Sequence, residues 1–188
     1  MFDRAELKAV AKSQIRGNIG IIFVCALLAG LIIGISSVVA WLTAPAFLIS
    51  FIMIFLNLSN GVRPEISHIF GGFSLMFKAL WLNILMGFFV FLWSMLLVVP
   101  GIMKSFAYMM APYILAENPN MTAREALNES KRITQGHKMD LFVLELSFIG
   151  WGLLCVITAG IAAIYVIPYM QATLANAYKA LKASSFSA

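Results

Sequence analysis

The stretch Ile19–Leu58 reads IGIIFVCALLAGLIIGISSVVAWLTAPAFLISFIMIFLNL and has no charged side chain in 40 residues. A transmembrane helix needs roughly 20 apolar residues to cross about 30 Å of hydrocarbon, so this stretch has the length of two crossings. Pro45 cannot continue a helix and biases the residue before it away from helical angles. We therefore expect a break at Trp41–Pro45 and spans at residues 19–40 and 44–58, the second short enough to be re-entrant instead.

The composition of the whole chain also favours a membrane environment. Of the 188 residues, 62% are hydrophobic and only 11% are charged, whereas roughly one quarter of an ordinary soluble domain is charged. A water-facing exterior could not hide this apolar surplus, which indicates an integral membrane protein. The length suits one compact unit, so we expect residues 1–188 to form a single membrane domain.

Four further apolar segments follow along the chain. They cover residues 79–99, 102–116, 141–158 and 161–178. Pro100-Gly101 and Ala159-Gly160 lie between the members of each pair, where tight turns are expected. The predicted fold class is therefore all-α, a polytopic helical membrane protein with about six transmembrane helices arranged as hairpins. The sequence leaves open whether segments 44–58 and 102–116 cross the membrane fully.

Two amphipathic helices are expected at the membrane surface. In residues 3–17 a basic side chain recurs every four positions, at Arg4, Lys8, Lys12 and Arg16. In residues 122–136 the spacing of Thr122 and Glu125 fits a capping box, and the basic residues there are Arg124, Lys131, Arg132 and Lys138. Such helices can hold basic stripes against anionic headgroups. The plainer alternative is that these charges only fix the orientation of the chain or form a solvated surface.

The basic residues are distributed to one side of the predicted hairpins. Of the 13 Lys and Arg residues, Lys104 alone falls on the other side. The remaining ones are Arg4, Lys8, Lys12, Arg16, Arg63, Lys78, Arg124, Lys131, Arg132, Lys138, Lys179 and Lys182. Cytoplasmic loops carry the excess of Lys and Arg, so both termini are expected in the cytoplasm. Because the charges alternate with apolar runs, anionic membrane lipids rather than nucleic acid are the expected partner.

A series of landmarks occurs twice in the second half of the chain. Trp93, Pro100-Gly101, Tyr108 and Pro112-Tyr113 are matched in order by Trp151, Ala159-Gly160, Tyr165 and Pro168-Tyr169. The pattern suggests repeating units of one surface helix followed by one hairpin. Residues 65–78 could supply the surface helix of a middle unit, which would make three units.

Several segments, taken in order, also resemble a known family. They are Leu92–Lys104, Met110–Pro119, Ala123–Leu127, Gly136–Lys138, Ser147–Trp151 and Pro168–Met170. The series is similar to the domain-of-unknown-function 975 family of bacterial predicted integral membrane proteins. The resemblance implies a multi-pass protein of the bacterial cytoplasmic membrane, but it supplies no activity and no catalytic residue to carry over.

Three polar residues are expected at membrane depth, where such groups are costly and often functional. Asn83 is expected to form an interhelical hydrogen bond. Lys104 is expected to extend its ammonium to the interface on the side opposite most of the charges. Glu145 could pair with Lys138 or Lys78, or it could line a polar cavity.

Other patterns that carry chemistry are weak. His68 and His137 have no second ligand at metal-binding spacing, so no metal site is expected. The glycines lack the strand and lysine of a phosphate loop, and neither a cofactor nor a catalytic residue is expected. Gly30-Leu-Ile-Ile-Gly34 has instead the spacing that lets membrane helices approach closely.

These observations favour a membrane protein that acts without catalysis. We expect it to work through anionic-lipid and protein contacts, including a homo-oligomer that organises the membrane. The alternative is a small transporter or channel subunit, which would need a polar path that joins Asn83, Lys104 and Glu145. A membrane enzyme is the third hypothesis.

Overall fold

The computed structural model describes residues 4–16, 18–33, 37–96 and 98–186, which contain helices and no strand. In chain order the elements are α1 (Arg4–Arg16), α2 (Ile19–Ile33), α3 (Ser37–Ser59), the 3-10 helix η1 (Ile66–Leu75), α4 (Met76–Leu96), α5 (Val98–Tyr108), α6 (Ala111–Glu117), α7 (Ala123–Ile133), α8 (Lys138–Leu146), α9 (Ile149–Ile157) and α10 (Ala163–Phe186). The predicted all-α class is confirmed for these residues.

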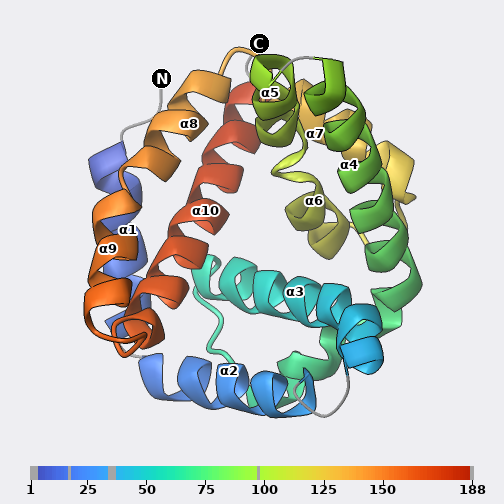
Figure 1. Ribbon diagram of the computed structural model, residues 1–188. Coiled ribbons are helices and arrows are strands. Elements are labelled where there is room, and N and C mark those ends of the chain that lie inside the picture. The colour runs from blue at the N-terminus through green and yellow to red at the C-terminus, as the bar shows by residue number, and fades with distance from the viewer. Residues whose placement is uncertain (1–3, 17, 34–36, 97, 187–188) are drawn as a thin grey trace.

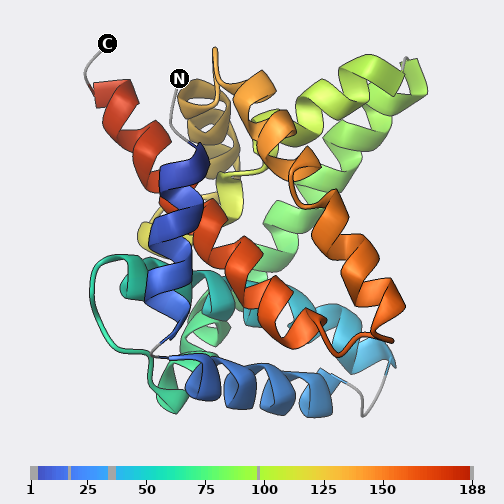
Figure 2. The ribbon, with the colours of Figure 1, turned by 90° about the vertical axis from the view of Figure 1, so that its left-hand side faces the viewer.

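Three helical hairpins surround the centre of the molecule (Figure 1). They are α2 with α3, α4 with α5, and α8 and α9 with α10. In Figure 2 the ends of the helices at which the two arms of each hairpin adjoin lie on the right, whereas α1, α7 and the last turns of α10 lie on the left. A helix precedes each hairpin, namely α1, η1 and α7. The order of elements therefore agrees with the three units suggested by the sequence.

The predicted break between the first two apolar segments is wrong. Helix α2 ends at Ile33, and α3 runs from Ser37 to Ser59 with Pro45 inside it. A proline removes one backbone hydrogen bond from a helix, and here Pro45 is buried within α3, as is Phe47, whose ring packs edge to face on Phe73 of η1. Packing of α3 therefore offsets the intrinsic tendency of Pro45 to break the helix. Gly34 of the predicted close-approach motif lies outside the described residues.

Six spans are not confirmed. Two helical stretches among the described residues are long and apolar enough to cross a membrane, Ile66–Met95 and Lys138–Ile157. A third is added if the bent pair of Ala5–Ile15 and Ile19–Leu28 is counted as one span. The apolar stretch Thr43–Ser59 is shorter. These apolar helices are compatible with insertion into a membrane.

The fourth predicted span, residues 102–116, is interrupted. Helix α5 ends at Tyr108, and α6 begins at Ala111 with Pro112 in its first turn. Proline is well tolerated in the first turn of a helix, where its missing N–H has no partner to lose, but not in a continuous helix. The seven residues of α6 are too few to continue a crossing, and all except Glu117 are buried.

The sixth predicted span, residues 161–178, lies within the longer helix α10. This helix has 24 residues, enough length to cross, but its side chains are more polar than those of the two candidate spans. Thr173 and Asn176 are buried in it, and the Nδ2 atom of Asn176 donates to Oε1 of Gln14 on α1 at 3.0 Å. Helix α10 packs against α1, α3 and α7, so its polar side chains serve the interior of the molecule.

The expected middle surface helix is the 3-10 helix η1, which packs closely on α3. The backbone N–H of Gly72 donates to Oγ of Ser50 at 2.9 Å, and the same hydroxyl donates to the carbonyl oxygen of Ala46. A Cβ on Gly72 would lie 2.2 Å from that carbonyl oxygen. Only glycine fits at this crossing.

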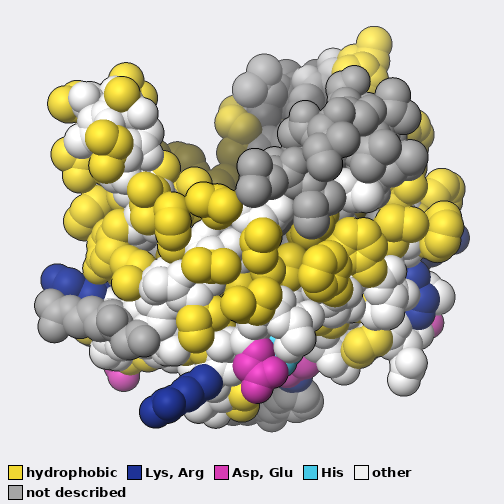
Figure 3. Space-filling view, turned by 90° about the horizontal axis from the view of Figure 1, so that it is seen from below, with side chains coloured by type: hydrophobic (Ala, Val, Ile, Leu, Met, Phe, Trp, Pro, Cys, Tyr) yellow, Lys and Arg dark blue, Asp and Glu magenta, His cyan; other side chains and the backbone are white. Residues whose placement is uncertain are grey.

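Large apolar side chains remain exposed along the hairpins. On α4 they include Phe77 at 78% exposure, Trp81, Phe88 and Phe91, and on α9 they include Val156 and Ile157. Figure 3 shows hydrophobic side chains spread across the middle of one face, with basic and acidic side chains toward its margin. Exposed apolar surface of this extent marks contact with a membrane or a partner protein.

The glycine crossing gives a direct test of the packing. Gly72→Ala should lower the free energy of unfolding by about 1–3 kcal/mol, because the added methyl group overpacks a backbone contact. Gly87→Ala on α4 is the control, since a Cβ there meets no atom within 4 Å and alanine favours helix. Thermal unfolding in detergent measures both, and equal melting temperatures for the two variants would contradict the close crossing.

Candidate functional site

The basic side chains of the predicted N-terminal helix lie in different environments. Lys8 is used inside the fold: its Nζ atom donates to Oγ of Ser147 at 2.6 Å and lies 4.6 Å from the ring centre of Phe148. Lys12 is exposed. The side chains of Arg4 and Arg16 lie outside the described residues. Helix α1 therefore offers one described basic side chain, Lys12, that faces solvent or headgroups directly.

The second predicted basic helix begins as expected. The N–H of Glu125 donates to Oγ1 of Thr122 at 3.3 Å, and Oε2 of Glu125 accepts from the N–H of Thr122 at 2.8 Å. This capping box satisfies two backbone groups at the start of α7. Its hydrogen bonds with Thr122, and secondarily the charge of Lys78, hold the pKa of Glu125 below its usual range. Arg124 is exposed beside the cap.

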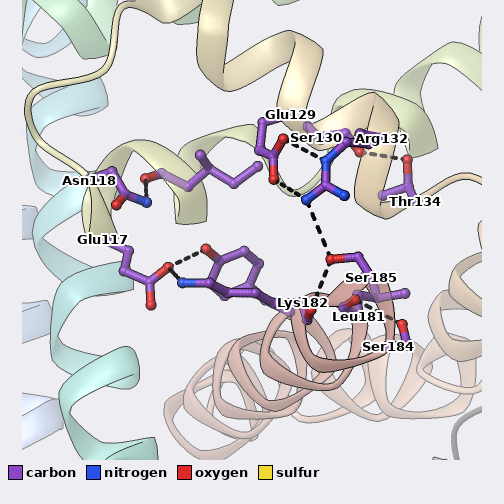
Figure 4. A network of polar contacts seen from close by, with 12 residues as sticks. Glu117, Asn118, Glu129, Ser130, Arg132, Thr134, Leu181, Lys182, Ser184 and Ser185 are labelled. Atoms are coloured by element: carbon purple, nitrogen blue, oxygen red, sulfur yellow. Dashed lines mark hydrogen bonds and ion pairs between the residues drawn. The ribbon is translucent and has the colours of Figure 1, made fainter. Parts of the chain in front are cut away.

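Arg132 is occupied by contacts within the protein. Its Nε and Nη2 atoms donate to the two carboxylate oxygens of Glu129 at 2.8 and 2.7 Å, and Nη2 also donates to Oγ of Ser185 at 3.5 Å. Figure 4 shows the guanidinium of Arg132 between Glu129 and Ser185. These contacts link α7 to the end of α10. Arg132 is therefore less available to lipid than the sequence suggests.

A second polar cluster joins the end of α6 to α10. The Glu117 Oε2 atom accepts from the hydroxyl of Tyr178 at 2.5 Å and from the ammonium of Lys182. Lys179 directly follows Tyr178 on α10, and its Nζ atom donates to the carbonyl oxygen of Ser59 at 2.9 Å. Sequence reasoning missed this cluster, since nothing in the spacing of these residues relates them.

The charge of Glu117 is stabilised in the folded protein. Burial acts to raise the pKa of Glu117, but hydrogen bonds from Lys182 and Tyr178 and the positive charges of Lys182 and Lys179 outweigh it, so the pKa lies below its usual range. The cluster thus holds three helices, α3, α6 and α10, together on the charged side of the molecule.

The three predicted intramembrane polar residues do not converge. Asn83 is exposed and donates from Nδ2 to the carbonyl oxygen of Ala79 on its own helix at 3.1 Å, and among the described residues it forms no bond to another helix. Glu145 forms no ion pair in the described part of the chain, and Lys78 donates instead to the carbonyl oxygen of Pro119 at 2.7 Å. The polar path needed by a transporter is therefore not formed by this set.

Lys104 does not stand opposite the other charges. Its Nζ atom lies 4.6 Å from the ring centre of Trp93 on α4, and the positive charges of Lys131 and Lys138 are near enough to act on it. Helix α5 packs against both α7 and α8, which carry these two lysines. The prediction that Lys104 lies apart from the other basic residues is therefore wrong.

An apolar groove of about 610 Å³ lies between α2, α3 and the start of α10. Phe23, Phe51 and Ile167 are among its apolar lining residues, and Gln171 is a polar one. The Oε1 atom of Gln171 accepts from the hydroxyl of Tyr113 at 2.9 Å. The amide is thus held by the interior of the protein, and the groove itself offers shape and apolar contact rather than chemistry.

The two histidines lie apart in the fold. His137 contacts Asp140 at 3.2 Å, whereas Nδ1 of His68 accepts from the backbone N–H of Glu65 at 3.3 Å. Over the residues that the structure describes, no group of three His, Cys, Asp or Glu side chains is placed to hold a metal ion.

Comparison with known proteins identifies a family for part of the chain. Residues 95–185 match the family described as Protein of unknown function (DUF975). The resemblance found in the sequence is confirmed over this carboxyl-terminal part, which contains α5 to α9, nearly all of α10, and the polar clusters of Arg132 and Glu117 apart from Ser59. No curated protein and no solved structure matches the chain significantly.

The Glu117 cluster predicts a pH-dependent stability. The folded-state pKa of Glu117 is depressed, so its ionised form contributes stability above its ordinary pKa of 4.5 and loses it as the pH falls through the folded-state pKa. A double-mutant cycle of Glu117→Gln with Lys182→Met should give a coupling of about 0.5–1 kcal/mol at neutral pH, because both groups are partly exposed. The coupling should shrink as the pH falls below 4.5 and through the depressed pKa of Glu117.

Chemical unfolding in detergent measures this cycle. Lys12→Met, a substitution on α1 that removes a basic residue from outside the cluster, serves as the control partner for Glu117→Gln. The two control substitutions should be additive within about 0.5 kcal/mol. Equal coupling in both cycles would contradict a specific cluster.

Proposed function

We propose that the chain is an integral protein of the bacterial cytoplasmic membrane that acts by binding anionic lipid and protein partners rather than by catalysis. Both termini face the cytoplasm, and the three hairpins enter the bilayer from that side. A homo-oligomer that organises the surrounding bilayer is the form of action that we favour.

The single observation that carries this proposal is the separation of exposed apolar from charged side chains. Ile157 at 80% and Ile161 at 73% exposure lie at the α9–α10 turn, and Met95 at 78% lies near the end of α4. Water would disfavour each of these side chains, since burying one contributes about 1.5–3 kcal/mol. Hydrocarbon around the hairpins removes that cost.

The charged side supplies the contacts with lipid. Lys12 and Arg124 are exposed, and neither forms an ion pair within the described part of the chain. A basic side chain near an anionic membrane surface contributes about 1 kcal/mol to association. By contrast, Arg132 and Lys182 are engaged with carboxylates of the protein itself.

The structure favours this function over transport. A transporter would need the polar groups at membrane depth to line a common path. Asn83 instead bonds to its own helix, Lys104 lies against Trp93, and Glu145 lies on α8 without an ion pair among the described residues. We therefore keep transport only as the alternative.

Charge reversal tests the lipid contacts. The double variant Lys12→Glu/Arg124→Glu should reduce the preference for phosphatidylglycerol over phosphatidylcholine several-fold, because each reversal replaces an attraction by a repulsion. Electron paramagnetic resonance of spin-labelled lipids measures the fraction of each lipid held at the protein surface. The difference should diminish at high salt, which screens charges at the surface.

The matched control is Lys12→Arg/Arg124→Lys, which keeps both charges and should keep the preference. An unchanged preference in the reversed variant would contradict a role for these two residues. A wild-type protein that shows no preference for the anionic lipid would contradict the proposed function itself.

A further inference from the structure

We propose that Lys104, Lys131 and Lys138 together form a specific binding site for the phosphate group of an anionic phospholipid. The inference rests on the proposed function, since it assumes a bilayer around the hairpins. It goes further because it assigns one lipid to one cluster of side chains. Diffuse attraction to a basic surface would not hold any individual lipid at a defined position.

Three helices bring these lysines together. Oγ of Ser130 on α7 donates to the carbonyl oxygen of Ala107 on α5 at 2.8 Å, in a buried contact that fixes the two helices. The rings of Phe106 on α5 and Phe142 on α8 meet edge to face with centres 5.7 Å apart. Lys131 directly follows Ser130, so the same contact sets its position.

Aromatic rings hold two of the ammonium groups. The Nζ atom of Lys131 lies 5.4 Å from the ring centre of Tyr108, and that of Lys104 lies 4.6 Å from the ring centre of Trp93. Lys104 and Tyr108 are four residues apart on α5 and therefore share one helix face. A cation over an aromatic face is stabilised but keeps its N–H donors for another acceptor.

The lysines carry positive charge that the described part of the protein does not neutralise. None of the three forms an ion pair among the described residues, while the neighbouring carboxylates of Glu129 and Asp140 face Arg132 and His137. The charges of Lys131 and Lys138 also repel that of Lys104. A phosphate oxygen would accept hydrogen bonds from these ammonium groups and relieve the repulsion.

The surroundings of the cluster favour a lipid as the source of the phosphate. Ile102 and Met103 beside Lys104 are 47% and 52% exposed, and Met139 beside Lys138 is 69% exposed. An acyl chain could lie against these apolar side chains while its headgroup meets the lysines. Basic pockets between helices at the cytoplasmic side of a membrane are suited to anionic headgroups.

The test compares two double variants that remove the same number of charges. Native mass spectrometry of the full chain in detergent, titrated with phosphatidylglycerol, measures the affinity of the first bound lipid. Lys131→Gln/Lys138→Gln should weaken that affinity about tenfold or more, since two phosphate contacts are lost. Arg63→Gln/Lys78→Gln, at two basic residues that lie outside the cluster and outside the lipid contacts proposed above, should change it less than about twofold.

Two further variants separate the site from the fold. Lys104→Gln should also weaken binding of phosphatidylglycerol, and Lys104→Arg should restore it, because arginine keeps the charge and the donors. Circular dichroism and the melting temperature in detergent confirm that each variant is folded. Phosphatidylcholine, titrated in the same way, should bind the wild type and the variants alike.

The outcomes distinguish a failure of the lysine site from a failure of the proposed function. Equal losses in the two double variants, while the wild type still prefers phosphatidylglycerol, would overturn the site and leave the proposed function standing. Equal binding of both lipids by the wild type would overturn both. Inorganic phosphate that competes at concentrations comparable to those of the lipid would also overturn the assignment to a lipid.

Discussion

Helix α10 is the element on which the arrangement of the other helices depends, because its polar side chains must find partners inside a largely apolar molecule. Gln171 accepts a hydrogen bond from α6, Asn176 donates to α1, and Lys179 donates to the end of α3. Helices α6, α1 and α3 are therefore each tied to α10 by a directional contact. Apolar packing alone would leave the rotation of the hairpins about their axes less well defined.

The sequence predicted those features that depend on local chemistry. The capping box of Thr122 and Glu125 starts α7 as expected. A helix followed by a hairpin also occurs three times along the chain, as the landmarks suggested. The number of spans could not be predicted from local sequence, because hydropathy does not show where tertiary packing overrides the tendency of proline to interrupt a helix. Pro45 remains inside α3, whereas Pro112 begins a separate buried helix. The Glu117–Tyr178–Lys182 cluster joins residues far apart in sequence, so no spacing could reveal it.

The basic side chains that the sequence groups together have two kinds of role. Lys8, Arg132, Lys179 and Lys182 donate to acceptors of the protein and help to fix its helices. Lys12 and Arg124 are exposed, and Lys104 and Lys131 lie against aromatic rings with donors left to offer. Basic residues that look equivalent in the sequence therefore differ in the fold, because some are held by the protein and others keep their donors available. The account depends on these contacts lying at a membrane surface.

The sidedness of the hairpins is the central claim, and cysteine accessibility in intact cells tests it most directly. Single cysteines would be placed at Ile161, beside the exposed α9–α10 turn, and at Arg124 on α7, after Cys25 and Cys155 are replaced by alanine. The account predicts that a membrane-impermeant maleimide labels position 161 in intact cells and position 124 only after the membrane is opened. Labelling of both positions from the same side would contradict it.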